Sequence, residues 1–268
     1  LIEKVAKKFS ESNNYKMTMN IDTDVDITIT EDGEEIEPSG VIRSDIDVEY
    51  SSADIGTYCK IFSITGDDDE SIDSIVENNE TYYVDESRMN YYSIDAGQNW
   101  YKGEKSVDEM SYGDLFTALF GDTEAFNNAT VEEKEDNYII TVDMSDIKDF
   151  AEQMSGGLAG ANAIGSAKLT INSDYLPVSM DISDIDFDTT TMEEALEATY
   201  ATGANVEAEG SEEEPVDLEA SEESNIDVSA DMNFTAKIEF GSWDKISDSD
   251  VTPSKEIIDA AKDVAEDE

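Results

Sequence analysis

The chain has 268 residues, with 67 Asp or Glu against 16 Lys or Arg, so its formal net charge is −51. The electrostatic field of so negative a chain repels phosphate backbones and anionic membrane surfaces, which excludes nucleic acid as a partner. Histidine is absent and Cys59 is the single cysteine, which excludes a Ser-His-Asp triad, a Cys-His pair, a histidine or multi-cysteine zinc site and an intramolecular disulfide. We therefore expect a non-enzymatic protein without a metal or other cofactor.

The chain begins with a predicted short amphipathic helix, because Ile2, Val5 and Phe9 share one helical face. Residues 17–30 then alternate strictly, with apolar side chains at most odd positions and polar, mainly acidic, ones at even positions. This period of two predicts an unusually long strand with one apolar and one acidic face. A second alternating run over residues 42–50 predicts that the two strands form a long hairpin.

The middle of the chain predicts shorter strands and one apolar helix. A third strand is expected over residues 57–64, and three short aromatic strands over 81–85, 90–94 and 98–102, since aromatic side chains suit a half-buried pleated surface. Residues 112–120 carry apolar side chains at helical spacing, so we expect a helix with a strongly apolar stripe there.

A further hairpin is predicted to join residues 129–134 to 138–144. Ser145 is a suitable N-cap for a helix whose apolar stripe continues to residue 154. Strands resume over residues 167–171 and 178–182, where apolar and polar side chains alternate again.

The C-terminal part predicts a helix over residues 189–200, a disordered acidic insertion over 203–224 and a strand over 226–240 that resembles the first long strand. The insertion has hardly any large apolar residue and cannot offset its ordering entropy. A last helix carries Ile257 and Ile258. We treat residues 1–268 as a single domain.

The order of these elements suggests a family. The features that carry the suggestion are the N-terminal amphipathic helix, the long hairpin, two inserted helices and the segments Tyr82-Tyr83, Trp100-Tyr101-Lys102 and Asp174-Tyr175-Leu176-Pro177-Val178. Together they resemble the LolA/LppX-like lipoprotein superfamily, and especially its Gram-positive surface-lipoprotein members. The resemblance implies an α+β fold in which a strongly curved antiparallel sheet, an unclosed half-barrel, has helices covering its concave face. It also implies that the space between sheet and helices holds acyl chains.

The apolar faces of the strands supply a candidate site for such a ligand, because methionine is flexible and polarisable and adapts to an acyl chain. The candidate ligand-binding residues are Met17, Met19, Ile21, Phe62, Tyr82, Trp100, Met180, Met232 and Phe234. A dry core beneath the helices over residues 112–120 and 147–154 explains the same residues, and it is the commoner arrangement in proteins.

Three other features allow a functional interpretation. The acidic turn over residues 67–70 has ligands suited to Ca²⁺, although a run of acids is more often simply solvated. Asp22, Asp24 and Asp26 imitate the start of an EF-hand, but strand alternation explains them better. The glycine-rich residues 156–165 suit a mobile flap over a cavity, or more simply a connector.

We expect an extracytoplasmic, monomeric lipoprotein that faces outward from the cell membrane, held by a lipid on a cysteine upstream of Leu1 after removal of a leader. It would bind a lipid or other hydrophobic ligand between its sheet and its helices. The alternative is a cell-surface interaction or structural module with a filled core, whose acidic face meets cations, cell-wall polymers or a basic protein. A saline habitat is a further explanation of the charge.

Overall fold

The computed structural model describes residues 1–12, 14–31, 34–67, 75–104, 112–150, 163–187, 189–190, 193 and 226–263. Its strands are β1 (Tyr15–Glu31), β2 (Glu34–Ala53), β3 (Gly56–Asp67), β4 (Ile75–Val84), β5 (Met89–Ser93), β6 (Tyr101–Glu104), β7 (Thr130–Lys134), β8 (Asn137–Asp143), β9 (Ala163–Asn172), β10 (Pro177–Phe187), β11 (Ile226–Gly241) and β12 (Lys262–Asp263). Its helices are α1 (Ile2–Ser10), α2 (Tyr112–Gly121), α5 (Asp248–Val251) and α6 (Lys255–Ala260), with 3-10 helices η1 (Glu124–Phe126) and η2 (Met144–Ile147).

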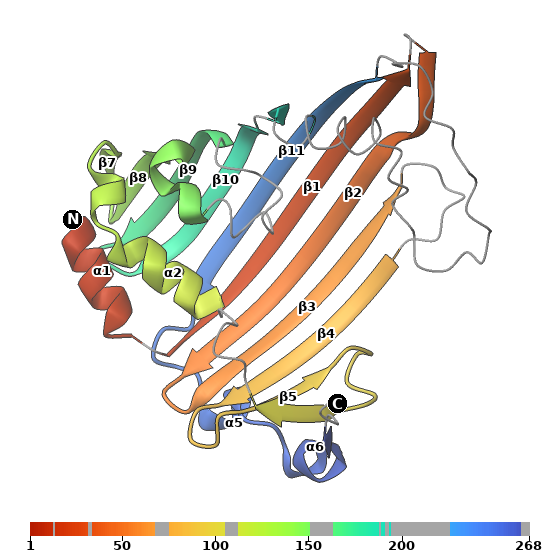
Figure 1. Cartoon of the computed structure of the whole chain (residues 1–268). Helices are drawn as coiled ribbons and strands as arrows, with labels where there is room; N and C mark the ends of the chain where they lie inside the picture. The colour runs from red at the N-terminus through yellow and green to blue at the C-terminus, as the bar shows by residue number, and fades with distance from the viewer. Residues whose placement is uncertain are drawn as a thin grey trace.

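The described strands form one sheet in the order β12-β6-β5-β4-β3-β2-β1-β11-β10-β9-β8-β7 (Figure 1). Neighbouring strands run antiparallel, except that β12 is parallel to β6. The two outermost strands, β7 and β12, do not pair with each other, so the sheet stays open. The predicted α+β fold with an unclosed, mainly antiparallel sheet is confirmed.

Strand β1 lies at the centre of the sheet and gives it two chemically different faces. It has 17 residues and pairs with β2 on one side and with β11 on the other. Met19 lies opposite Val48 and Ile238, so the apolar positions of the three strands share one side. We call this side, with the odd positions of β1 and the even positions of β2 and β11, the core face, and the opposite side the acidic face.

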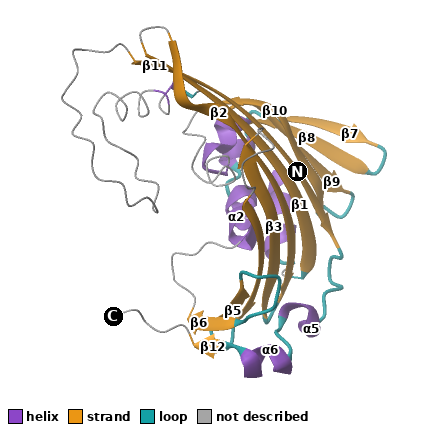
Figure 2. Ribbon diagram, turned by 90° about the vertical axis from the view of Figure 1, so that its right-hand side faces the viewer, coloured by secondary structure: helices purple, strands orange, loops and turns teal. Residues whose placement is uncertain are grey.

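The core face packs against helices α1 and α2. Val5 and Phe9 of α1 are buried, and the ring of Phe116 in α2 meets that of Phe240 in β11 edge-on, with 5.0 Å between centroids. Both helices belong to one continuous hydrophobic cluster with residues of β1, β2, β8, β9, β10 and β11. Figure 2 shows α2 on the inner side of the bend of the sheet. The predicted apolar stripes of both helices are confirmed.

Strand pairing in the sheet is irregular at two places. The β1–β2 register shifts between Ile27 and Ile29, and the β10–β11 register shifts between Ile182 and Ile185. Extra residues of this kind bend a strand and increase its twist. Pro38 lies within the first shift, where a residue without a backbone N–H costs no ladder hydrogen bond.

The structure also corrects some predicted bounds. β4 begins at Ile75 rather than residue 81, and the helix predicted from Ser145 starts as the 3-10 helix η2. β12 was not predicted. Residues 68–70 of the acidic turn, residues 203–224, most of the glycine-rich segment and most of the predicted helix over 189–200 lie outside the described residues. In the described part of the chain, no helix has the length and apolar character needed to span a membrane.

The two faces predict opposite responses to substitution within the same strand. Met19→Asp should lower the free energy of unfolding by at least about 3 kcal/mol, because it places an unpaired charge in the core. Asp24→Asn should change it by no more than about 0.5 kcal/mol, because the Asp24–Arg43 pair at 3.4 Å is half exposed. Urea titration of both variants measures this, and a costly Asp24→Asn would contradict the assignment of faces.

Candidate ligand-binding site

Six of the candidate residues lie together on the core face. They are Met17, Met19, Ile21, Met180, Met232 and Phe234. None has more than 5 % of its surface exposed. Burial of this degree is that of side chains in a close-packed protein interior, and none of the six lines either of the two cavities described below.

The other three candidates, Phe62, Tyr82 and Trp100, are not brought together with the first six. Phe62 in β3 lies opposite Asp47, which in turn lies opposite Asn20 of β1, so Phe62 belongs to the acidic face. Tyr82 lies two residues beyond Glu80 on the same side of β4, and its ring is 5.8 Å from that of Trp100. A single ligand between the sheet and α2 cannot touch both groups.

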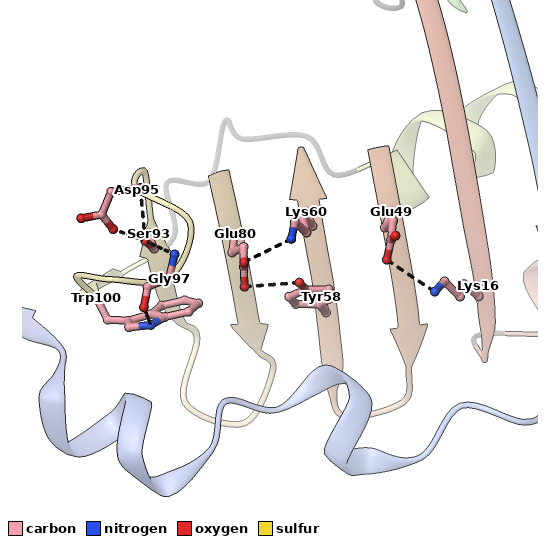
Figure 3. A network of polar contacts seen from close by, with 9 residues as sticks. All are labelled: Lys16, Glu49, Tyr58, Lys60, Glu80, Ser93, Asp95, Gly97 and Trp100. Carbon is pink, nitrogen blue, oxygen red and sulfur yellow. Dashed lines mark hydrogen bonds and ion pairs between the residues drawn. The ribbon is translucent and has the colours of Figure 1, made fainter. Parts of the chain in front are cut away.

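Tyr82 and Trp100 belong instead to a network of polar and aromatic contacts on the acidic face, and Figure 3 shows its polar contacts and the place of Trp100. The hydroxyl of Tyr58 donates a hydrogen bond to Glu80 at 3.4 Å, and Lys60 forms an ion pair with Glu80 at 3.6 Å. The rings of Tyr58 and Tyr82 are 4.7 Å apart. Burial, and then the charge of Glu80, raises the pKa of Tyr58, so its hydroxyl stays protonated as a donor.

A turn centred on Asp95 holds Trp100 in this network. The side chain and the backbone N–H of Asn99, at 2.5 and 2.8 Å, and the hydroxyl of Ser93, at 2.8 Å, donate hydrogen bonds to the Asp95 carboxylate. These bonds, chiefly the one from the Asn99 side chain, lower the pKa of Asp95 to about 2. The indole N–H of Trp100 donates to the carbonyl of Gly97 at 3.0 Å. All these partners lie within one short segment, so the turn is a structural device.

A cavity of about 310 Å³ lies elsewhere, where α1 and α2 meet the ends of β1, β2, β3 and β4. We call it the tyrosine pocket. The described residues that line it are Phe9, Ser10, Ser12, Tyr15, Tyr50, Ser52, Ala53, Asp54, Thr57, Tyr83, Asp85, Asp114 and Thr117. None of the nine candidate residues is among them.

Aromatic rings form the inner part of the tyrosine pocket. Phe9, Tyr15 and Tyr50 are buried, with ring centroids 5.5 Å apart for Phe9 and Tyr15 and 6.0 Å for Tyr15 and Tyr50. Tyr83 is half-buried. Burial, followed by the nearby Tyr50 and Asp114, raises the pKa of Tyr15, so this ring remains neutral. The rings of the lining are therefore uncharged, whereas its five serine and threonine residues are polar.

The outer part of the pocket is acidic. Asp54, Asp85 and Asp114 are exposed, and they come from three separate parts of the chain: the β2–β3 turn, the end of β4 and the start of α2. Among the described lining residues there is no Lys or Arg. The approach of β4 to this corner requires Gly56, since a Cβ there would lie 2.2 Å from the carbonyl oxygen of Tyr83.

A second, smaller cavity of about 210 Å³ lies between α2 and η2. Leu115, Leu119 and Phe150 contribute apolar surface to it, whereas Asp122 and Asp146 contribute charge. Its volume is below the usual range of ligand pockets, about 300–1,000 Å³.

Other chemistry is scarce in the described part of the chain. No group of three or more Asp, Glu, Cys or His side chains there is arranged to hold a metal ion. Burial raises the pKa of the Cys59 thiol to about 12, so the thiol stays protonated near neutral pH.

The sequence contained one signal for the tyrosine pocket. Tyr15 and Tyr50 lie at the ends of the apolar stripes of β1 and β2, where a residue with an apolar ring and a polar tip suits the boundary between core and solvent. The carboxylates that meet them come from distant positions, which no local pattern indicates. Neither a scan against models of known protein families nor a search of curated proteins finds a match to this sequence.

The Asp95 turn predicts a response to acid. Because the folded-state pKa of Asp95 is depressed, its contribution to stability is fully present above its ordinary pKa of 3.8 and is lost as pH falls towards about 2. Asp95→Asn removes the carboxylate charge, so it should remove this contribution to stability at neutral pH. It should also speed amide hydrogen exchange at Asn99. Exchange measured by NMR at pH 7 tests this, with Asp136→Asn, in an exposed hairpin turn, as the control. Unchanged exchange at Asn99 would contradict the role of the carboxylate.

Proposed function

We propose that this chain is a non-enzymatic, extracytoplasmic lipoprotein whose helices cover the concave side of its sheet and which binds a hydrophobic ligand between helices and sheet. The tyrosine pocket is the place of binding, and the methionines of the core face form the packed layer behind it. A lipid anchor upstream of Leu1 would keep the protein at the outer surface of the cell membrane.

One observation carries the proposal: a cavity of about 310 Å³ lies between the two helices and the sheet, with aromatic rings inside. This volume lies at the small end of the range for ligand pockets, about 300–1,000 Å³. The pocket therefore suits a small molecule or a short alkyl chain. The close packing of Met17, Met19 and Met180 argues against a long acyl chain running through the layer beneath α2.

A second candidate function, a surface interaction module, is favoured by the acidic face. Asp22 of β1 lies directly opposite Asp45 of β2, and Asp26 lies directly opposite Asp231 of β11. Like charges at such positions destabilise a sheet. Slight desolvation, followed by a hydrogen bond and charge repulsion with Asp22, raises the pKa of the exposed Asp45. A positively charged partner on this face would relieve the repulsion.

Ser52→Phe tests the first proposal, because Ser52 lines the pocket from the core-face side of β2. The added ring should fill the cavity and weaken binding of an uncharged fluorescent probe, N-phenyl-1-naphthylamine, at least tenfold. Fluorescence titration of the purified protein measures the affinity.

Thr28→Phe is the matched control, since it adds the same ring on the exposed acidic face of β1. It should leave probe binding unchanged. Equal affinity of the wild type and both variants would mean that the probe does not enter the tyrosine pocket, and the proposal would then fail.

Asp45→Asn tests whether the acidic face is under electrostatic strain. Because the pKa of Asp45 is raised in the folded state, ionisation of this group opposes folding above that pKa, and stability rises as pH falls through it. The substitution should therefore raise the melting temperature at neutral pH and low salt, and the gain should shrink as salt screens the charges. A lower melting temperature at low salt would show that the Asp22–Asp45 pair is not repulsive.

A further inference from the structure

The tyrosine pocket combines two kinds of surface that together select the charge of a ligand. Its inner part consists of the rings of Phe9, Tyr15 and Tyr50, with Tyr83 beside them. Its outer part carries the carboxylates of three aspartates, and the described lining residues include no basic side chain. An apolar pocket for an uncharged ligand needs only the first of these surfaces.

The aromatic rings are suited to a cation. A positive charge is attracted to the face of a tyrosine ring within about 6 Å of its centroid. Tyr15 and Tyr50 both line the pocket, with ring centroids 6.0 Å apart and planes tilted by 45°. Asp114 lines the same pocket as Tyr15 and Tyr50, which places a carboxylate near these rings.

The same carboxylates act against an anion. A fatty-acid carboxylate or a phosphate headgroup entering the pocket would pass Asp54, Asp85 and Asp114, and the whole chain adds a net charge of −51. A quaternary ammonium or a primary amine is instead attracted both by these three carboxylates and by the net negative charge of the chain. The two surfaces therefore favour the same class of ligand.

We propose that the tyrosine pocket binds an organic cation, an ammonium or amine group attached to a short apolar chain, with the charge between the tyrosine rings and the carboxylates of Asp54 and Asp114. This inference rests on the proposed function, because it names the ligand class of the same pocket.

Three ligands with one tail separate the charge from the apolar chain: octyltrimethylammonium, octanol and octanoate. Calorimetric titration at an ionic strength of about 0.15 M limits the attraction from distant charges. The ammonium should bind at least tenfold more tightly than octanol, and octanoate should bind most weakly. Ser52→Phe should weaken binding of the ammonium at least tenfold, whereas Thr28→Phe should not.

Paired charge variants distinguish the pocket from the general field of the protein. Asp54→Asn with Asp114→Asn should weaken ammonium binding at least tenfold. The pair Asp22→Asn with Asp26→Asn removes the same amount of charge from the acidic face. It should change the affinity for octyltrimethylammonium less than threefold. Asp54→Asn alone, in an exposed turn, should weaken binding in the same direction if the first pair does not fold.

Each alternative result overturns a defined part of the account. Equal binding of the three ligands, lost in Ser52→Phe, would refute selection of a cation but keep the pocket and the proposed function. Equal losses in both pairs of charge variants would mean that the ammonium responds only to net charge. If no ligand binds, the pocket is not a ligand site, and the proposed function fails with the inference.

Discussion

The structure depends on the register between β1 and its two neighbours. Over about sixteen residues β1 pairs with β11, and the apolar positions of both strands fall on one side. A shift of one residue in either pairing would turn Asp24 or Asp26 towards the core and Met19 towards solvent. The burial of the apolar face against α1 and α2 therefore specifies the register, and the high negative charge of the other face makes the alternative registers still less stable.

Most of the central sheet could be predicted because its signals are local. The alternation in β1, β2 and β11 and the helical spacing in α2 each lie within one segment. β3 is different, since Tyr58 and Phe62 on one side and Cys59 and Ile61 on the other make both faces apolar. Only its register against β2 decides which side meets the core, and this is why Phe62 could not be placed from the sequence. The parallel β12–β6 pair joins two distant segments and has no local pattern.

The candidate site shows the same limit. The sequence leaves open whether the methionines of the apolar faces line a cavity or fill a core, because side-chain type does not reveal whether the neighbouring helices pack closely, and here they do. The cavity forms instead at a corner where six elements begin or end, namely α1, α2, β1, β2, β3 and β4. Helices and strands that end at the same corner do not fill the space between them as closely as packed layers do. Their polar terminal residues supply the aspartates of the outer part of the pocket. In the function that we propose, the stabilising core is thereby separate from the ligand site.

The central claim is that the methionine layer is closed and that a ligand with a short apolar chain enters at the tyrosine pocket. A crystal structure of the protein grown with octyltrimethylammonium tests it most directly. The account predicts electron density for the ligand beside Tyr15 and Tyr83, with Met19 and Met180 still in contact with their present neighbours. Density for an alkyl chain between Met19 and Met180, with α1 and α2 displaced from the sheet, would contradict it.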